Sequence, residues 1–184
     1  MPYIDTHNTI PGIRGLFEYR KETSAAMNQL AQVLLADDHP SLSRSERELI
    51  ATFVSSQNEC KFCMTTHGYI AAHLPDCNIQ LVNEVWKDYQ QAPISDKMKS
   101  LLQIADKVRV SGRKITETDI EGARNLGASD LDIHDTVLIA AAFCMFNRYV
   151  DGLGATTPND PAFYEKVGEQ RAKEGYLTKS ILVK

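Results

Sequence analysis

The sequence predicts an all-α protein. Apolar residues recur three or four positions apart along most of the chain, which is the spacing of one helix face. Serine, threonine and aspartate, which commonly cap helices, stand before several of these stretches. No hairpin dipeptide lies between two alternating runs. We therefore expect a single domain over residues 1–184, built as an oligomeric bundle of about seven or eight helices.

The first half of the chain contains three expected helices. Thr23 is expected to cap a segment that runs to about Asp37, and Ser43 to Glu46 form a capping box that opens a second helix. The polar run 55–58 is interpreted as a break. Asn58 would then cap a helix that carries Cys60 to His73 and ends before Pro75.

The second half contains five more expected helices, each with a start and a stop signal. They run from Asp76 to before Pro93, from Ser95 to Gly112, from Thr116 to Gly127, from Ser129 to about Asp151, and from Asp160-Pro161 to Gly175. Residues 1–15 and 176–184 are expected to be irregular, and ends of this kind often wrap a neighbouring subunit.

Composition restricts the classes of function. A chain of 184 residues with 43% hydrophobic content suits one domain with its own core. It has 20 basic and 24 acidic residues and no basic run, so nucleic acid and membrane surfaces are not expected partners. The N-terminus does not resemble a signal peptide, and no apolar run approaches the ~18 residues of a membrane span. We therefore expect a cytoplasmic protein, in which a close cysteine pair is typically catalytic or metal-binding.

Cys60, Cys63 and His67 form the most informative pattern of the sequence. On a helix these positions share one face, so the two thiols would lie close enough to form a disulfide. Unpaired amides at the helix start would favour a thiolate at Cys60, and His67 could take the proton of Cys63. Glu48, on the preceding helix, could orient that imidazole. We expect the segment to be electropositive and partly open, as reactive cysteines require.

Alternative interpretations remain open for these residues and their neighbours. Cys60, Cys63 and His67 supply three zinc ligands, with Cys77 as a possible fourth, or the two thiols are inert core residues. Four other candidates are expected to be structural: Cys77, Cys144, His73, and His134 with Asp135. A further set, Asn147 with Arg148 and Asp151, either forms a buried salt-bridge group or lines the site.

The spacing of Glu48, Cys60, Cys63 and His67 resembles the AhpD-like alkylhydroperoxidase core of the carboxymuconolactone decarboxylase-like superfamily. The flanking segments 42–48, 58–60, 66–68 and 146–153 look like its "peroxidase-related" branch, and the likeness covers about residues 10–170. It implies an all-helical fold, a homo-oligomer (dimer, trimer or hexamer), and peroxide reduction without haem, flavin, metal or other cofactor. The redox core would span about residues 40–155.

The resemblance also implies roles for individual residues. Cys63 would attack the hydroperoxide, Cys60 would resolve it and exchange with a thiol or dithiol reductant, and His67 with Glu48 would relay protons. Phe62 stands where the best-known members have a histidine between the cysteines. The decarboxylase branch lacks the cysteine pair, so we do not expect lactone decarboxylation. The alternatives are a dithiol–disulfide electron carrier for another peroxidase and a zinc-stabilised binding protein without enzymatic activity.

Overall fold

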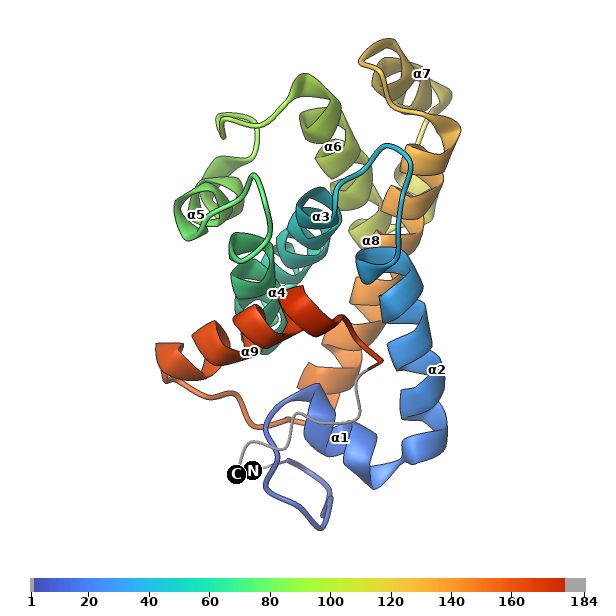
Figure 1. The fold of residues 1–184 in the computed structure, drawn as a ribbon. Coiled ribbons are helices and arrows are strands. Elements are labelled where there is room, and N and C mark those ends of the chain that lie inside the picture. The colour runs from blue at the N-terminus through green and yellow to red at the C-terminus, as the bar shows by residue number, and fades with distance from the viewer. Residues whose placement is uncertain (1, 178–184) are drawn as a thin grey trace.

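The computed structural model describes residues 2–177, and this part of the chain is helical without any strand. The helices, shown in Figure 1, are α1 (Ile13–Tyr19), α2 (Lys21–Ala31), α3 (Arg44–Gln57), α4 (Lys61–Ala72), α5 (Ile79–Asp88), α6 (Asp96–Val110), α7 (Glu117–Asn125), α8 (Asp130–Gly152) and α9 (Pro161–Glu174). A π-helical turn over Gln32–Ala36 follows α2, and a 3-10 turn over Gly112–Lys114 follows α6. The all-α prediction is confirmed. Among the helices of this region, none is long and apolar enough to cross a membrane.

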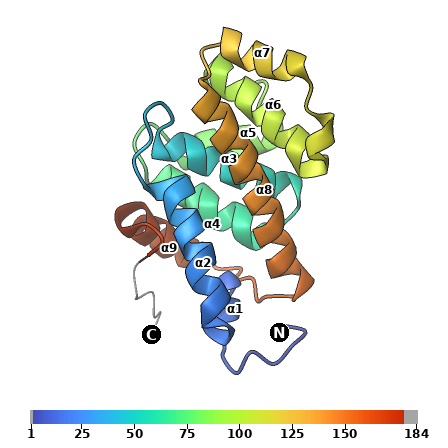
Figure 2. The same ribbon diagram turned by 90° about the vertical axis from the view of Figure 1, so that its right-hand side faces the viewer.

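Helix α3 lies at the centre of the bundle, where it packs against α4, α6 and α8 (Figures 1 and 2). Ten of its fourteen residues are buried, including Arg47 and Glu48, because neighbouring helices surround it on most sides. Helix α4 packs against α3 on one face and against α9 on another, so it is held between two other helices. The helix that carries Cys63 and His67 is therefore held inside the bundle.

Most of the predicted helix starts are confirmed. Ser43, Thr116 and Ser129 each form a complete capping box with the acidic residue three positions later, and Ser95 and Asp160 cap their helices with the side chain. These caps satisfy amides that have no partner within the helix, which is why short polar residues precede helices so regularly.

The predicted break at residues 55–58 is wrong. Helix α3 continues to Gln57, because Ser55 and Ser56 donate their hydroxyls to the helix carbonyls of Ala51 and Phe53. Asn58 is the C-cap of α3, and Cys60 is the N-cap of α4 rather than its second residue. The turn between the two helices is therefore shorter than the sequence suggested.

Two other starts also differ from expectation. The first helical segment begins at Ile13, inside the range expected to be irregular, and Thr23 lies within α2, where its hydroxyl donates to Arg20 O. Asn78 caps α5 by accepting from Leu81 N, whereas Asp76 lies in the preceding turn with φ of 61°. Thr23 therefore bonds inside a helix that has already begun, and Asp76 lies before the helix that it was expected to cap.

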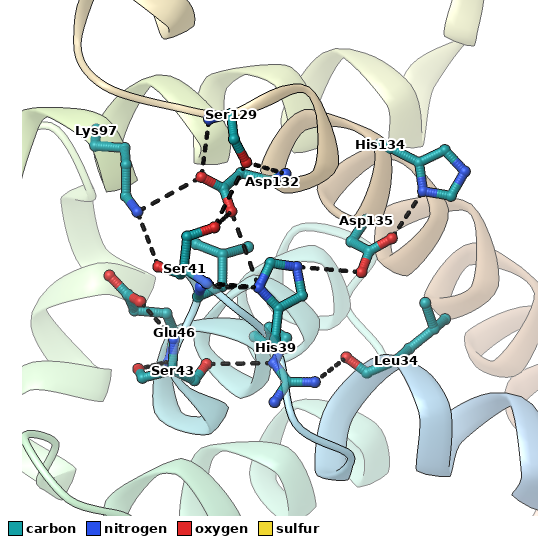
Figure 3. A network of polar contacts seen from close by, with 12 residues as sticks. Leu34, His39, Ser41, Ser43, Glu46, Lys97, Ser129, Asp132, His134 and Asp135 are labelled. Atoms are coloured by element: carbon teal, nitrogen blue, oxygen red, sulfur yellow. Dashed lines mark hydrogen bonds and ion pairs between the residues drawn. The ribbon is translucent and has the colours of Figure 1, made fainter.

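A network of polar contacts, drawn in Figure 3, fixes the loop that leads into α3. His39 Nδ1 accepts a hydrogen bond from the backbone N–H of Leu42 at 2.9 Å, so the imidazole ring stabilises the conformation of this loop. Ser41 donates its hydroxyl to the buried Asp132 at the start of α8, and Lys97 of α6 lies 3.7 Å from the same carboxylate. The start of α3 is thereby tied to α6 and α8, which sets the position of Glu48 one turn later.

Candidate active site

The two cysteines lie at the first turn of α4 and are both reduced and buried. Cys60 is 0% exposed and Cys63 is 3% exposed. The Cys63 thiol hydrogen-bonds to Cys60, and Cys60 in turn hydrogen-bonds to the carboxylate of Asp151 on α8. Asn147, one turn earlier on α8, hydrogen-bonds to Cys63. A chain of polar contacts therefore leads from Cys63 through Cys60 to Asp151.

These contacts raise the pKa of Cys63 well above its ordinary value. The hydrogen bond to Cys60 is the largest cause, burial is the second, and the bond from Asn147 opposes them. The predicted partly open and electropositive setting is therefore wrong for the resting state. Lys61 is exposed and donates to Asn159, so its charge is directed to the surface. Cys63 is a neutral thiol in this arrangement and needs a proton acceptor before it can attack a peroxide.

His67 and Glu48 form a close pair, as the sequence suggested. His67 Nδ1 lies 2.7 Å from Glu48 Oε2, and the carboxylate is fully buried. The carboxylate accepts the Nδ1 proton, which leaves Nε2 as the nitrogen that can accept another. The ring packs edge-on against Phe143, with 4.6 Å between ring centroids, so its plane is fixed. No hydrogen bond joins His67 to either cysteine within residues 2–177, so proton exchange with Cys63 requires a water or the substrate.

Tyr176 is a member of the site that the sequence analysis missed. Its hydroxyl donates to Glu48 Oε1 and lies 3.3 Å from His67 Nδ1. Burial, followed by the charge of Glu48, raises the pKa of Tyr176 well above its usual value, so the phenol remains a donor. Tyr176 reaches the site because Gly175 ends α9 with φ of 71°, a conformation that favours glycine. A bulky apolar residue directly after a helix-ending glycine commonly packs back on the last turn, and this signal was present in the sequence.

A small cavity of about 80 Å³ lies beside Cys63 and His67. Its lining is mostly apolar and comes from α1, α2, α4, α8, α9 and Tyr176. Phe62 forms part of the wall and packs against Gly12, where an added Cβ would lie 1.9 Å from the ring. The residue between the cysteines thus supplies an apolar surface instead of the polar group expected from a histidine.

The remaining candidates of the sequence analysis lie outside this site, except Asn147 and Asp151. Cys77 lies in the short connection between α4 and α5, and burial raises its pKa to about 11. His134 contacts its neighbour Asp135, and His73 at the end of α4 pairs with Glu165. In the described part of the chain, no group of three or more His, Cys, Asp or Glu side chains is arranged to hold a metal ion. Ligand geometry therefore gives no support to the zinc alternative.

Comparison with known proteins places this geometry in a family. The model of the carboxymuconolactone decarboxylase family matches residues 21–74, the stretch that contains Glu48, both cysteines and His67. An uncharacterised peroxidase-related protein from Silicibacter sp. TM1040 superposes with a TM-score of 0.75 and 29% identity, over 85% of this chain and 79% of that one. The match and the shared fold support an AhpD-like member of the carboxymuconolactone decarboxylase superfamily.

Two further solved structures share the fold of this chain. A peroxidase-related protein from Ralstonia eutropha JMP134, described as an alkylhydroperoxidase AhpD core, has a TM-score of 0.73 and 25% identity, over 87% of this chain and 82% of that one. A protein of unknown function from Agrobacterium tumefaciens, with a proposed role as the antioxidant defence protein AhpD, shares the fold at a TM-score of 0.65 and 20% identity, over 79% of this chain and 97% of that one. A search of curated proteins found no match.

Proposed function

We propose that this AhpD-like protein is a thiol peroxidase that reduces hydroperoxides through a Cys60–Cys63 disulfide. The observation that carries the proposal is the position of Cys63. It lines a small apolar cavity together with His67, while its sulfur contacts Cys60 on the other side. One thiol thus faces the space for a small substrate and the other is already in place to form the disulfide.

In the first step, Cys63 attacks the terminal oxygen of the hydroperoxide. The Cys63 proton passes to His67 Nε2, directly through the bound peroxide or through a water, and Glu48 stabilises the resulting imidazolium. The O–O bond breaks, Cys63 becomes a sulfenic acid, and the departing alkoxide takes the proton from His67 and leaves as an alcohol. Tyr176 holds Glu48 in place as the charge moves.

In the second step, Cys60 attacks the sulfur of the sulfenic acid. The proton of Cys60 passes to Asp151, with which it already shares a hydrogen bond, and then to the leaving hydroxide, so that water is released. A thiol or dithiol reductant then exchanges with the disulfide, becomes oxidised and restores both thiols. A surface hollow of about 410 Å³, lined by Asn147 and Asp151, offers an approach for the reductant on the Cys60 side.

The electron-carrier alternative uses the same disulfide but makes different demands on the fold. A carrier in its dithiol form must present a sulfur to the disulfide of another protein, whereas in this dithiol form Cys60 and Cys63 are both almost completely buried. A carrier also has no need for an apolar cavity beside its reactive sulfur. Both features favour a small hydroperoxide as the oxidant.

The test is mass spectrometry of the native protein before and after one equivalent of tert-butyl hydroperoxide, followed by peptide mapping. We expect a loss of two hydrogens confined to the Cys60–Cys63 peptide, and catalytic consumption of peroxide when a dithiol is added. Cys60→Ser should trap Cys63 as a sulfenic acid that a dimedone probe labels, and Cys63→Ser should not react. Cys77→Ser is the matched control and should behave like the unchanged protein. Intact thiols at both positions after peroxide treatment would refute the proposal.

A further inference from the structure

Two residues that line the cavity beside Cys63 each carry a buried polar atom without a hydrogen-bond partner. The atoms are Arg14 Nη1, contributed by α1, and Thr66 Oγ1, contributed by α4. Buried polar groups in proteins are almost always paired, so two unpaired ones on residues of one cavity indicate that a ligand pairs with them. The same cavity borders the proposed peroxide-attacking thiol.

Two arginines, Arg14 and Arg171, reach the cavity, and only Arg171 has a buried carboxylate nearby: Glu48, which bonds the lining residues Tyr176 and His67 and acts on Arg171 through its charge. No aspartate or glutamate is among the residues that line the cavity. Burial, followed by the charge of Arg171, lowers the pKa of Arg14 to about 10, and Glu18 only partly opposes this. Arg171 donates Nη1 to Gly175 O and lies over the ring of Tyr176, so it has partners that Arg14 lacks. A desolvated guanidinium next to a second one is unfavourable unless an anion joins them.

Thr66 lies between the two reactive side chains of α4. It is one turn beyond Cys63 and directly precedes His67, and all three line the cavity. Its hydroxyl can donate to an oxygen of a molecule held above Cys63. The polar groups of the cavity are thus divided: Thr66 and His67 stand beside the sulfur, and Arg14 belongs to the wall formed by the first helix.

We infer that the substrate is an organic hydroperoxide with a carboxylate, held by Arg14 with support from Arg171, while Thr66 donates a hydrogen bond to the peroxide. This inference rests on the proposed peroxidase function and specifies its substrate class. Guanidinium groups bind carboxylates with two parallel hydrogen bonds, which would satisfy the free Nη1. The carbon chain between the two groups must be short, because the cavity of about 80 Å³ is smaller than the ~150 Å³ site known to admit benzene.

The experiment compares two small probes that differ in charge and little in shape: hydroperoxyacetate and its primary amide. At neutral pH we expect kcat/KM to be at least about tenfold higher for the carboxylate. Arg14→Gln should remove this preference by lowering kcat/KM for the carboxylate towards the value for the amide. Arg14→Lys should keep part of the preference, because the charge remains but the paired donors are lost. Arg20→Gln, at an exposed arginine just after α1, is the matched control and should change neither value.

Equal kcat/KM values for the two probes, with both consumed, would overturn the inference and leave the peroxidase proposal intact. Circular dichroism of each variant shows whether it has folded, and Arg14→Lys keeps the test available if Arg14→Gln does not fold. Binding of the product acid, glycolate, is measured separately by calorimetry. If no hydroperoxide is consumed but this acid binds in an Arg14-dependent manner, the anion site stands and the peroxidase proposal fails.

Discussion

The hydrogen bond from Tyr176 to Glu48 gives the sharpest test of the site's construction. Tyr176→Phe keeps the ring beneath Arg171 and beside His67 and removes a single hydroxyl. A buried hydrogen bond to a charged group contributes about 1.5–3 kcal/mol to the free energy of unfolding. For a chain of this size, such a loss lowers the Tm by about 3–12 °C. Thermal and urea unfolding followed by circular dichroism measure both quantities.

A double-mutant cycle separates the charged contact from general packing. In a Glu48→Gln background, the hydroxyl of Tyr176 bonds a neutral amide, so removing it should cost about 0.5–1.5 kcal/mol. We therefore expect a coupling free energy of about 1 kcal/mol or more. Tyr164→Phe is the matched control, because this buried hydroxyl donates to a carbonyl, Pro158 O, and should show no coupling to Glu48. Additive costs for Tyr176 and Glu48 would refute our account of a carboxylate held by two donors.

Four further predictions follow from the same geometry. His67→Gln should lower kcat/KM for a hydroperoxide by about 10²–10⁴, and Glu48→Gln by less, as measured by peroxide consumption; unchanged rates would exclude the relay. Cys60→Ala should lower the pKa of Cys63 in alkylation-rate profiles, because the bond to Cys60 is the largest cause of its elevation; an unchanged profile would contradict this. The pKa of Tyr176 in the folded protein lies above the ordinary value of 10.0, so above pH 10 the unfolded chain binds fewer protons at this residue and the free energy of unfolding should fall as pH rises. Tyr176→Phe should make this fall smaller in urea titrations, and an equal fall in both proteins would contradict the prediction. Helix α8 exposes three apolar residues that are spaced seven positions apart, Leu131, Leu138 and Met145, so light scattering should give a mass above that of the 20.6 kDa chain. A monomer at micromolar concentration would disprove this prediction.

Local rules in the sequence predicted much of the fold. The capping boxes at Ser43 and Ser129 and the Asp160-Pro161 start depend on contacts within four residues, so they can be recognised without the tertiary structure. The failure at residues 55–58 has a local cause as well. Serine hydroxyls can bond either to a following amide as a cap or back to a helix carbonyl, and the sequence does not state which bond is formed.

The sequence by itself determined the helical class, the closeness of Cys60 and Cys63 along the chain, and the shared helix face of Cys63 and His67. These follow from the period of a helix and from spacing along the chain. Only the tertiary structure decided that Tyr176 completes the Glu48 pair, that Asp151 contacts Cys60, and that Arg14 stands unpaired in a cavity beside Cys63. Each of these features involves segments far apart in sequence and depends on burial. The packing of separate helices decides which segments meet and which side chains are buried, so no local sequence pattern could have predicted these features.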